Sequence, residues 1–390
     1  MLTCNLVKRR TVLALSVATL LAAGSGHANE PAKEPIKVGA ILAMSGPGAT
    51  FGTAMRNAIQ VTAAQVNSEG GIDGRPVEVV FYDDRTEPSE AARGVTQLVN
   101  RDGVVAIVGA GTGGNTLAAG PVAQRMGVPL VAPVGTLPVT SRDNAFFPWV
   151  FRSAVNDRTQ IEVILEDIAA AKVSKVGILY QEDAYGKTGA DLITELAADL
   201  GMEVVAKVAA PYTATDLTAA ATRLREAGAD AVLMQVSISA LGAAFMKAAH
   251  EVQLGATIYG AAGLAQRSFV ESVDATANGL RMPSTGNLVY GPEGGEKVLH
   301  ELLTAAGLQP QGWAELVGAA GFQSVVAAAR SIEGEVTGQS MRDSLEKLCD
   351  FETSLRGRAC FDETHESRGG DSLVIVEIRD RTMQPVGTGE

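Results

Sequence analysis

The sequence predicts an α/β protein whose two similar lobes each contain a parallel β-sheet. From Ile36 onward, short runs rich in β-branched residues alternate with longer segments whose apolar residues recur at helical spacing. The runs are apolar along their length, as strands of a parallel sheet are when helices cover both faces. The chain of 390 residues is also longer than one hydrophobic core normally organises. These observations favour two Rossmann-like lobes over a single domain.

The first series of strands and helices ends near Arg152. Its strand candidates are Ile36–Ala43, Val77–Tyr82, Val104–Gly109 and Pro129–Ala132. A helix is predicted over 52–67 because its apolar residues share one face and Gly70 and Gly71 follow it. A second helix is predicted over 88–100, since Pro88 is tolerated in the first turn of a helix.

The segment Ala145–Arg152 joins the first series to a second series of comparable length. The second set of strand candidates is Lys175–Tyr180, Met202–Ala209, Ala231–Val236, Thr257–Gly260 and Gly279–Pro283. A helix is predicted over 215–227, where Thr215 or Asp216 can cap the first turn. Thereafter helical segments precede two further strands: Gly294–Ala306, Trp313–Ile332, Ser340–Leu348, then Gly357–Phe361 and Leu373–Ile378. We expect the chain to return to lobe one and then to lobe two, so that several crossings form a hinge.

The N-terminal residues 1–28 have the pattern of a secretory signal peptide. Lys8, Arg9 and Arg10 precede an apolar stretch over 11–22, which is too short to span a bilayer. Small residues follow, and cleavage is predicted after Ala28. Cys4 precedes the apolar stretch rather than following it, which argues against a lipid anchor. The protein is therefore expected to be exported.

Removal of the signal peptide takes three positive charges from a net charge of −12 and leaves −15. Such a surface repels nucleic acid and anionic membranes, so neither is expected as a partner. Cys349 and Cys360 are the cysteines that follow the signal peptide, and in an oxidising compartment they are predicted to form a disulfide bond. The alternative is two buried free thiols, and neither cysteine is expected to be catalytic.

No cofactor, metal or catalytic residue is expected. Gly109, Gly111 and Gly114 formally match a dinucleotide-binding fingerprint, but the acidic residue required about 20 positions later is absent. The histidines beyond the signal peptide have no neighbouring motif of nucleophile or metal ligands and are interpreted as surface residues: His250, His300 and His365. The acidic run over 83–87 is interpreted as a solvated loop rather than a calcium site.

Four motifs in order resemble the leucine/isoleucine/valine-type (type I) periplasmic binding proteins. They are the opening strand and loop Ile36–Pro47, the helix end Asn67–Ile72, the strand exit Tyr82–Asp84 and the turn Gln181–Gly186. The resemblance extends from Glu34 to Glu377. It implies the type I periplasmic binding protein fold with three inter-lobe crossings, and a ligand held in the cleft for delivery to an ABC-type membrane permease in the periplasm.

With this fold, lobe one is expected over 29–152 and 286–351, and lobe two over 153–285 and 352–390. In the family, the loop after the third strand grips the ligand's carboxylate through a serine hydroxyl and backbone N–H groups. Gly113 replaces that serine here, so donors are expected from the neighbouring Thr112, Asn115 and Thr116. The next strand exit matches the family's second ligand loop, in which Val134 supplies a backbone carbonyl and Thr136 a hydroxyl.

The resemblance assigns further ligand-binding positions to the opening of lobe one and to lobe two. In lobe one these are Ser45 and the aromatic wall Phe51. In lobe two they are Tyr185, whose ring can pack on the ligand, together with Ser237 and Ile238 in the place of a family tyrosine. For the aromatic residues, ordinary core packing is the alternative.

Ala262 occupies the position where amino-acid binders of the family carry a glutamate for the α-ammonium group. A buried ammonium without a carboxylate partner costs several kcal/mol. Either Asp157 or Asp183 therefore substitutes, or the ligand has no ammonium group. The function predicted is a periplasmic solute-binding component of an ABC importer for a small amino acid or a related small carboxylate or amide, aromatic acids included. The alternatives are a sensory receptor module and, less favoured, an exported enzyme.

Overall fold

The computed structural model describes residues 33–367 and 373–386, and the chain divides into two compact units, Met1–Lys33 and Glu34–Glu390. The predicted signal peptide, 1–28, lies outside the described residues, so its cleavage stays a prediction. In the part of the chain that is described, no helix has the length and apolar character needed to cross a membrane. Everything below concerns the second unit.

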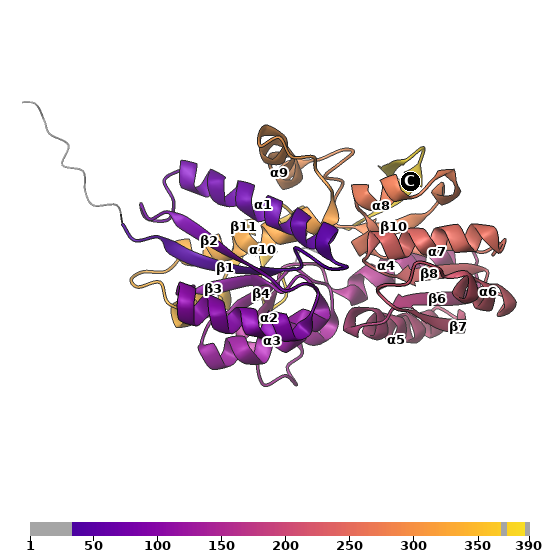
Figure 1. The fold of residues 1–390 in the computed structure, drawn as a ribbon, viewed down its shortest axis with the longest axis horizontal. Helices are drawn as coiled ribbons and strands as arrows, with labels where there is room; N and C mark the ends of the chain where they lie inside the picture. The colour runs from indigo at the N-terminus through magenta and orange to yellow at the C-terminus, as the bar shows by residue number, and fades with distance from the viewer. Residues whose placement is uncertain (1–32, 368–372, 387–390) are drawn as a thin grey trace, which may run out of the picture. The chain divides into compact units, whose positions relative to one another are not determined.

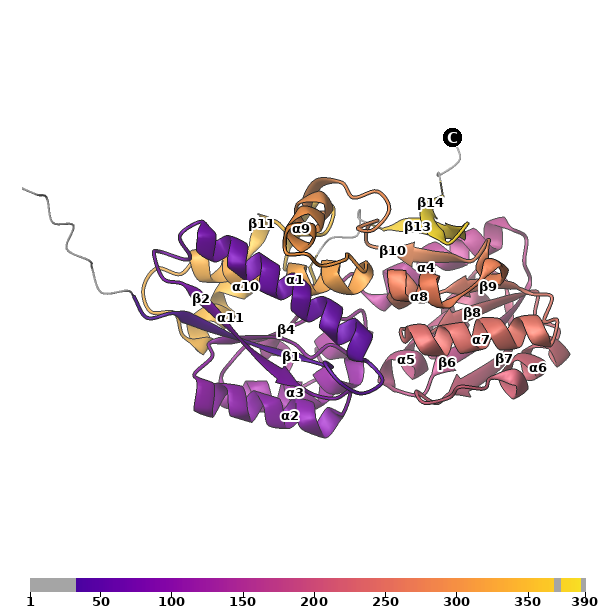
Figure 2. The same ribbon diagram turned by 45° about the horizontal axis from the view of Figure 1, so that its top comes forward.

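The first sheet has five parallel strands in the order β2-β1-β3-β4-β5. They are β1 Ile36–Leu42, β2 Val77–Asp83, β3 Ala106–Gly109, β4 Leu130–Ala132 and β5 Val150–Arg152. Helices α1 Ala49–Ser68 and α10 Trp313–Arg330 cover one face, and α2 Pro88–Gln97 and α3 Gly113–Met126 cover the other (Figures 1 and 2). Along β1, alternate side chains such as Ala40 and Ile41 enter the two separate cores on opposite faces, as the period of two in a strand requires.

The second sheet has seven strands in the order β14-β13-β10-β9-β8-β6-β7. The parallel strands are β6 Lys175–Gln181, β7 Glu203–Ala210, β8 Ala231–Gln235, β9 Thr257–Gly260 and β10 Arg281–Ser284, and the antiparallel edge is β13 Val374–Arg379 and β14 Thr382–Pro385. Its helices are α4 Asp157–Ala170, α5 Ala184–Asp199, α6 Thr218–Glu226, α7 Ser239–Glu251 and α8 Arg267–Ser272. Two sheets with covering helices confirm the predicted fold class.

The segment after β10 belongs mostly to the first lobe. It contains α9 Gly294–Ala305, α10, α11 Gly338–Leu345 and the antiparallel hairpin β11 Cys349–Glu352 with β12 Arg358–Cys360. A disulfide bond joins Cys349 to Cys360 across this hairpin, as predicted. The next residue, Phe361, packs edge-on against Phe151 of β5, with ring centroids 5.4 Å apart.

The hairpin corrects the expected lobe boundary at residue 352. The strand predicted over 357–361 pairs with β11 of lobe one and not with the sheet of lobe two, because the disulfide and the Phe151–Phe361 contact hold it there. At Glu366 the chain still lies beside β5, because Glu366 forms an isolated parallel β-bridge with Arg152. We therefore place the third crossing after residue 367. The other two crossings lie between β5 and α4 and between β10 and α9.

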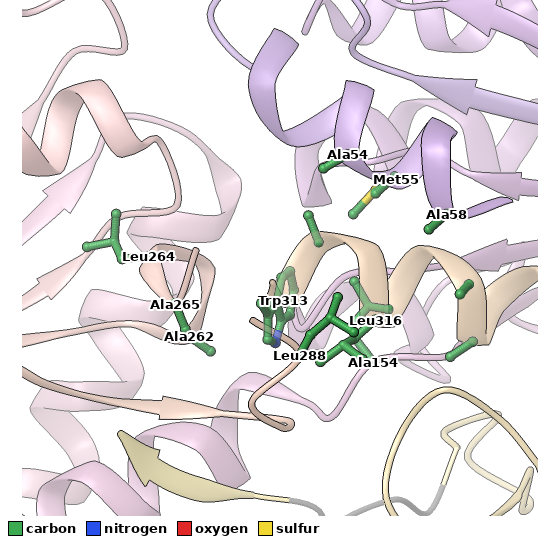
Figure 3. Packing of buried hydrophobic residues seen from close by; sticks show 14 of the residues in the cluster. Ala54, Met55, Ala58, Ala154, Ala262, Leu264, Ala265, Leu288, Trp313 and Leu316 are labelled. Atoms are coloured by element: carbon green, nitrogen blue, oxygen red, sulfur yellow. The ribbon is translucent and has the colours of Figure 1, made fainter. Parts of the chain in front are cut away.

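One apolar core cluster is continuous from lobe to lobe. Figure 3 shows Trp313, at the start of α10, between Leu264 and Ala265 of lobe two and Leu316 and Met55 of lobe one; all belong to the same cluster of buried residues. A backbone hydrogen bond joins the two lobes at the same place: the N–H of Trp313 donates to the Ala265 carbonyl over 3.2 Å. Lobe two therefore contacts lobe one directly beside the hinge strands.

Candidate functional site

A cavity of about 30 Å³ lies between the lobes, where strands of both sheets end. The carboxyl ends of parallel strands are the usual place for ligands in open α/β sheets. Its lining comes from loops after β3, β4, β6, β8 and β9 and from the starts of α1, α3, α4, α5 and α10. The lining residues are Phe51, Gly111, Thr112, Gly113, Val134, Gly135, Thr136, Asp157, Gln160, Gln181, Asp183, Tyr185, Ser237, Gly263 and Trp313.

Most of the ligand positions predicted from the sequence line this cavity. They are Phe51, Thr112, Gly113, Val134, Thr136, Tyr185 and Ser237. Loops that the resemblance assigns to the ligand in both lobes therefore border one cavity.

Other predicted ligand positions do not line the cavity. The Ser45 hydroxyl donates to Asp83 over 2.6 Å on the exposed loop after β1. The hydroxyl of Thr116 is fully buried and donates to the carbonyls of Ala110 and Thr112, so the helix itself uses it. Asn115 is buried in the first turn of α3 behind Thr112. The hydroxyls of Ser45 and Thr116 thus hydrogen-bond within lobe one, and none of the three residues lines the cavity.

Two lobe-two positions also lie elsewhere. Ile238 lines an outer groove of lobe two rather than the inter-lobe cavity. Ala262 lines a smaller cavity of about 10 Å³ beside the main one, and this smaller cavity shares Asp157, Gln160 and Tyr185 with it.

The N-terminus of α3 opens onto the cavity. Thr112 is the N-cap residue, with extended backbone angles, and its hydroxyl oxygen accepts a hydrogen bond from Asn115 N–H over 3.3 Å. The first N–H groups of a helix have no partner within the helix, and the helix dipole is positive at this end. Gly113, the first residue of α3, brings this end of the helix to the cavity wall.

Thr136 and Gly113 are in close contact across this end of the cavity. A β-carbon built on Gly113 would lie 2.2 Å from Oγ1 of Thr136 and 2.7 Å from its Cβ. Thr136 is fully buried, and its hydroxyl has no hydrogen-bond partner among the described residues. The Thr136 hydroxyl thus occupies the space that a side chain at position 113 would need in this arrangement of the two loops.

Asp157 is the first residue of α4, which Asn156 caps by accepting from Thr159 N–H over 3.0 Å. The Asp157 side chain is 3% exposed, and its Oδ2 atom has no hydrogen-bond partner among the described residues. Burial raises the pKa of Asp157 to about 7; the positive charge of Arg152 acts in the opposite direction. The negative charges of Asp183 and Glu366 add to the increase. Asp157 is therefore a buried carboxyl group that titrates near neutrality.

Asp183, by contrast, is engaged within lobe two. One carboxylate oxygen caps α5 by accepting from Gly186 N–H over 2.8 Å. The other oxygen accepts hydrogen bonds from the Tyr212 hydroxyl and from the Gln181 amide. Burial still raises the pKa of Asp183, but both of its oxygens have donors.

The lobe-two wall is fixed by Gln181 and Tyr185. Oε1 of Gln181 accepts from both the backbone N–H and the hydroxyl of Ser237, over 2.8 and 3.1 Å. The Ser237 hydroxyl is thus directed at Gln181 rather than at the cavity. Burial raises the pKa of Tyr185 well above its ordinary value, so its phenol stays neutral and can both donate and accept.

Sequence reasoning missed Trp313, which forms one wall of the cavity. Its ring centroid lies 5.6 Å from that of Phe51, and its indole N–H is buried without a hydrogen-bond partner among the described residues. The sequence placed Trp313 at the start of a helix expected in lobe one, but gave no indication that its side chain reaches the cavity. The other lining residues that were not predicted are Gly111, Gly135, Gln160, Gln181 and Gly263.

The cavity combines hydrogen-bond donors with an acidic group. The donors are the N-terminus of α3 and the Thr136 hydroxyl, and Asp157, next to Gly135, supplies an acceptor. Aromatic rings of Phe51, Tyr185 and Trp313 form walls. No Lys, Arg or His lines the cavity, and the described part of the chain contains no group of three or more His, Cys, Asp or Glu arranged to hold a metal ion.

Sequence comparison identifies the family. A profile described as periplasmic binding protein matches residues 35–382, so the chain belongs to the periplasmic binding protein family. It is 29% identical to the Leu/Ile/Val-binding protein homolog 3 of Brucella melitensis, over 60% of this chain and 63% of that protein. It is 26% identical to the leucine-, isoleucine-, valine-, threonine- and alanine-binding protein of Pseudomonas aeruginosa, over 91% of this chain and 93% of that protein.

Two solved structures illustrate the range of ligands that similar proteins hold. The branched-chain amino acid transporter substrate-binding protein LivJ of Streptococcus pneumoniae, in complex with isoleucine, has a TM-score of 0.79 and 25% identity, over 90% of this chain and 99% of that chain. A solute-binding protein of an ABC transporter from Rhodopseudomonas palustris, in complex with 3,4-dihydroxybenzoic acid, has a TM-score of 0.79 and 24% identity, over 90% and 96%. These comparisons confirm the predicted fold and family resemblance.

Proposed function

We propose that this protein is the solute-binding component of an ABC importer and that its ligand is a small amino acid. Support comes from the polar groups that line the cavity. The N-terminus of α3 and the Thr136 hydroxyl suit a carboxylate, while an ionised Asp157 suits an ammonium group. The observation that carries the proposal is the buried, unpartnered Oδ2 of Asp157. A buried carboxylate without a partner is costly, and a cationic group on the ligand relieves that cost.

Asp157, rather than Asp183, is the proposed ammonium partner. Donors within lobe two already engage both oxygens of Asp183. Asp157 also lines the small cavity next to Ala262, the position at which the resembled family carries a glutamate. A carboxylate from α4 therefore lies beside the space that the glutamate would reach from lobe two.

Ligand entry requires the lobes to separate. A cavity of about 30 Å³ has room for about two water molecules and not for an amino acid. Domain closure about hinge strands is a common way for two-lobed proteins to enclose a ligand. A ligand favours the closed arrangement only through contacts that it gains there. In this protein those contacts come from Tyr185 and the Ser237 loop of lobe two.

A carboxylic acid without an ammonium group is the second candidate ligand. With a pKa of about 7, Asp157 is partly protonated at neutral pH and can donate a hydrogen bond instead of accepting one. The aromatic walls suit a flat ring, and the R. palustris structure contains a dihydroxybenzoic acid. In this alternative, the carboxylate still binds at the start of α3.

Calorimetry with a matched ligand pair separates the two candidates. L-Isoleucine and 3-methylpentanoate differ only in the amino group, and 3,4-dihydroxybenzoate tests the aromatic alternative. An amino-acid site binds isoleucine and not 3-methylpentanoate, and Asp157→Asn abolishes the difference. The exposed Asp143→Asn serves as a control and retains wild-type affinity. Binding of the benzoate alone selects the second candidate, and equal affinity for both aliphatic ligands contradicts the role of Asp157.

The importer role needs separate tests. If the protein is exported, it should be found in the periplasmic fraction with the mass that cleavage after Ala28 gives. Mass spectrometry of that fraction measures this mass. Uptake of the bound solute by vesicles that contain the partner permease tests the transport role. Chemical turnover of the solute by the purified protein would favour an exported enzyme, and an unchanged uptake rate without the protein would favour a sensory module.

A further inference from the structure

Arg152 connects the hinge to the loop that carries Thr136. It is the last residue of β5, and its side chain is fully buried. Its guanidinium donates to the carbonyls of Gly135, Thr136 and Leu137 over 3.1, 3.0 and 2.8 Å, and to the Thr140 hydroxyl over 2.7 Å. A planar group with several fixed donors can satisfy these acceptors together, which a lysine ammonium cannot do.

The same residue is bonded to residues 365–367, which precede the third crossing. Arg152 N–H donates to the carbonyl of His365 over 2.8 Å, and Ser367 N–H donates to the carbonyl of Arg152 over 2.9 Å. Its guanidinium also lies 3.4 Å from a carboxylate oxygen of Glu366. The other oxygen of Glu366 accepts from the Asn156 side chain over 2.8 Å, and Asn156 caps the helix that begins with Asp157.

The charges around Asp157 are few and mostly negative. Arg152 is the positive group that acts on it, and Asp183 and Glu366 are the negative ones; the phenol of Tyr185 also faces it. A buried cation is tolerated when nearby carboxylates and hydrogen bonds compensate its desolvation. Arg152 has both, so its charge can act on Asp157 through a weakly screened interior.

We infer that Arg152 is a positioning residue for the ligand site: it fixes the loop that carries Thr136 and supplies the positive charge beside Asp157. The ligand does not need to touch Arg152, which does not line the cavity. The inference rests on the proposed function for the roles of Thr136 and Asp157. Because both effects exist without ligand, they can be measured in the ligand-free protein.

The experiment follows two NMR signals. The first is the carboxyl ¹³C shift of Asp157, assigned by comparison with Asp157→Asn, and it reports the midpoint of titration. The second is the methyl signal of Thr136, assigned with Thr136→Ser, and it reports loop position. Arg152→Met removes both the charge and the hydrogen bonds. It should raise the Asp157 midpoint by about one pH unit or more and shift the Thr136 signal. Arg152→Lys keeps the charge, so it should shift the Thr136 signal while leaving the midpoint near that of wild type.

A second variant keeps the inference testable if Arg152 cannot be replaced without unfolding. Glu366→Gln removes a negative charge from a partly exposed side chain and should lower the Asp157 midpoint. Arg142→Met removes an exposed positive charge near the same crossing and should leave the midpoint unchanged. An unchanged midpoint in Arg152→Met or Glu366→Gln, an unchanged Thr136 signal in Arg152→Lys, or an equal shift in Arg142→Met overturns the inference. Failure of every ligand to bind would count against the proposed function alone.

Discussion

Replacing Gly113 with alanine tests the packing at the donor end of the cavity. A β-carbon at this position would lie 2.2 Å from Oγ1 of Thr136 and 2.7 Å from its Cβ, closer than real β-carbon contacts occur. Because Thr136 is fully buried, the clash is relieved only by displacing its side chain or by moving α3. Overpacking of this kind costs about 1–3 kcal/mol. Displacing the hydroxyl should also weaken ligand binding.

Gly114 provides a matched control in the same turn of α3. A β-carbon there has no atom within 4 Å, so Gly114→Ala introduces no clash. Both substitutions gain helix propensity of up to about 1 kcal/mol, and the difference between the two variants isolates the clash. Thermal unfolding should place the Gly113→Ala midpoint several degrees below that of Gly114→Ala, at about 2–4 °C per kcal/mol. Equal midpoints and equal affinities for L-isoleucine would refute this account of the site.

Three further predictions concern the other parts of the molecule. First, because the pKa of Asp157 is about 7 rather than the ordinary 3.8, affinity for L-isoleucine should fall, by up to about tenfold per pH unit, as calorimetry is carried from pH 8 to 6. Over about pH 4–7 the folded protein holds a proton on Asp157 that the unfolded chain has lost, so this group lowers stability as pH rises; Asp157→Asn should therefore raise the thermal midpoint of the ligand-free protein at pH 8. If neither the affinity nor the thermal midpoint changed with pH, this would contradict a pKa of about 7 for Asp157. Second, Thr136→Ala and Tyr185→Ala should weaken binding in calorimetry while circular dichroism stays native, and wild-type affinity in both would refute the placement of the ligand. Third, replacing Cys349 and Cys360 by serine should reduce stability in urea unfolding by about 2–3 kcal/mol and leave affinity unchanged, since the hairpin does not line the cavity; a loss of affinity would show that the hairpin reaches the site.

The fold could be predicted because the spacing of apolar residues within short stretches of sequence distinguishes strands from helices. The apolar runs that became β1, β6 and β8 are buried in the centre of parallel sheets, where continuous apolar character is needed. The hairpin β11–β12 could not be placed in the same way. Its two strands are neighbours in the sequence, but the contact that places the hairpin in lobe one joins Phe361 to Phe151, about 200 positions earlier, and no local pattern encodes it.

The candidate site was predictable to the level of loops but not of side chains. The family resemblance pointed to Thr136 and Tyr185, and both line the cavity, where the carboxyl ends of parallel strands converge. Thr116 has the right chemistry and neighbours the cavity in sequence, but helix geometry turns its hydroxyl back to the carbonyls of its own turn. Trp313 reaches the cavity only through the return of the chain to lobe one, which is a tertiary property.

Gly113 and Gly135 determine where the polar side chains of this site can lie. Gly113 leaves room for the Thr136 hydroxyl, because a β-carbon at position 113 would lie 2.2 Å from Oγ1 of Thr136. Gly135 has a parallel role, since a β-carbon there would lie 2.2 Å from Oδ1 of Asp157 and 2.8 Å from Nε2 of Gln160. A larger residue at either position would displace one of the two groups proposed to hold the ligand. The absence of a side chain at Gly113 and Gly135 therefore matters to the cavity as much as the side chains that line it.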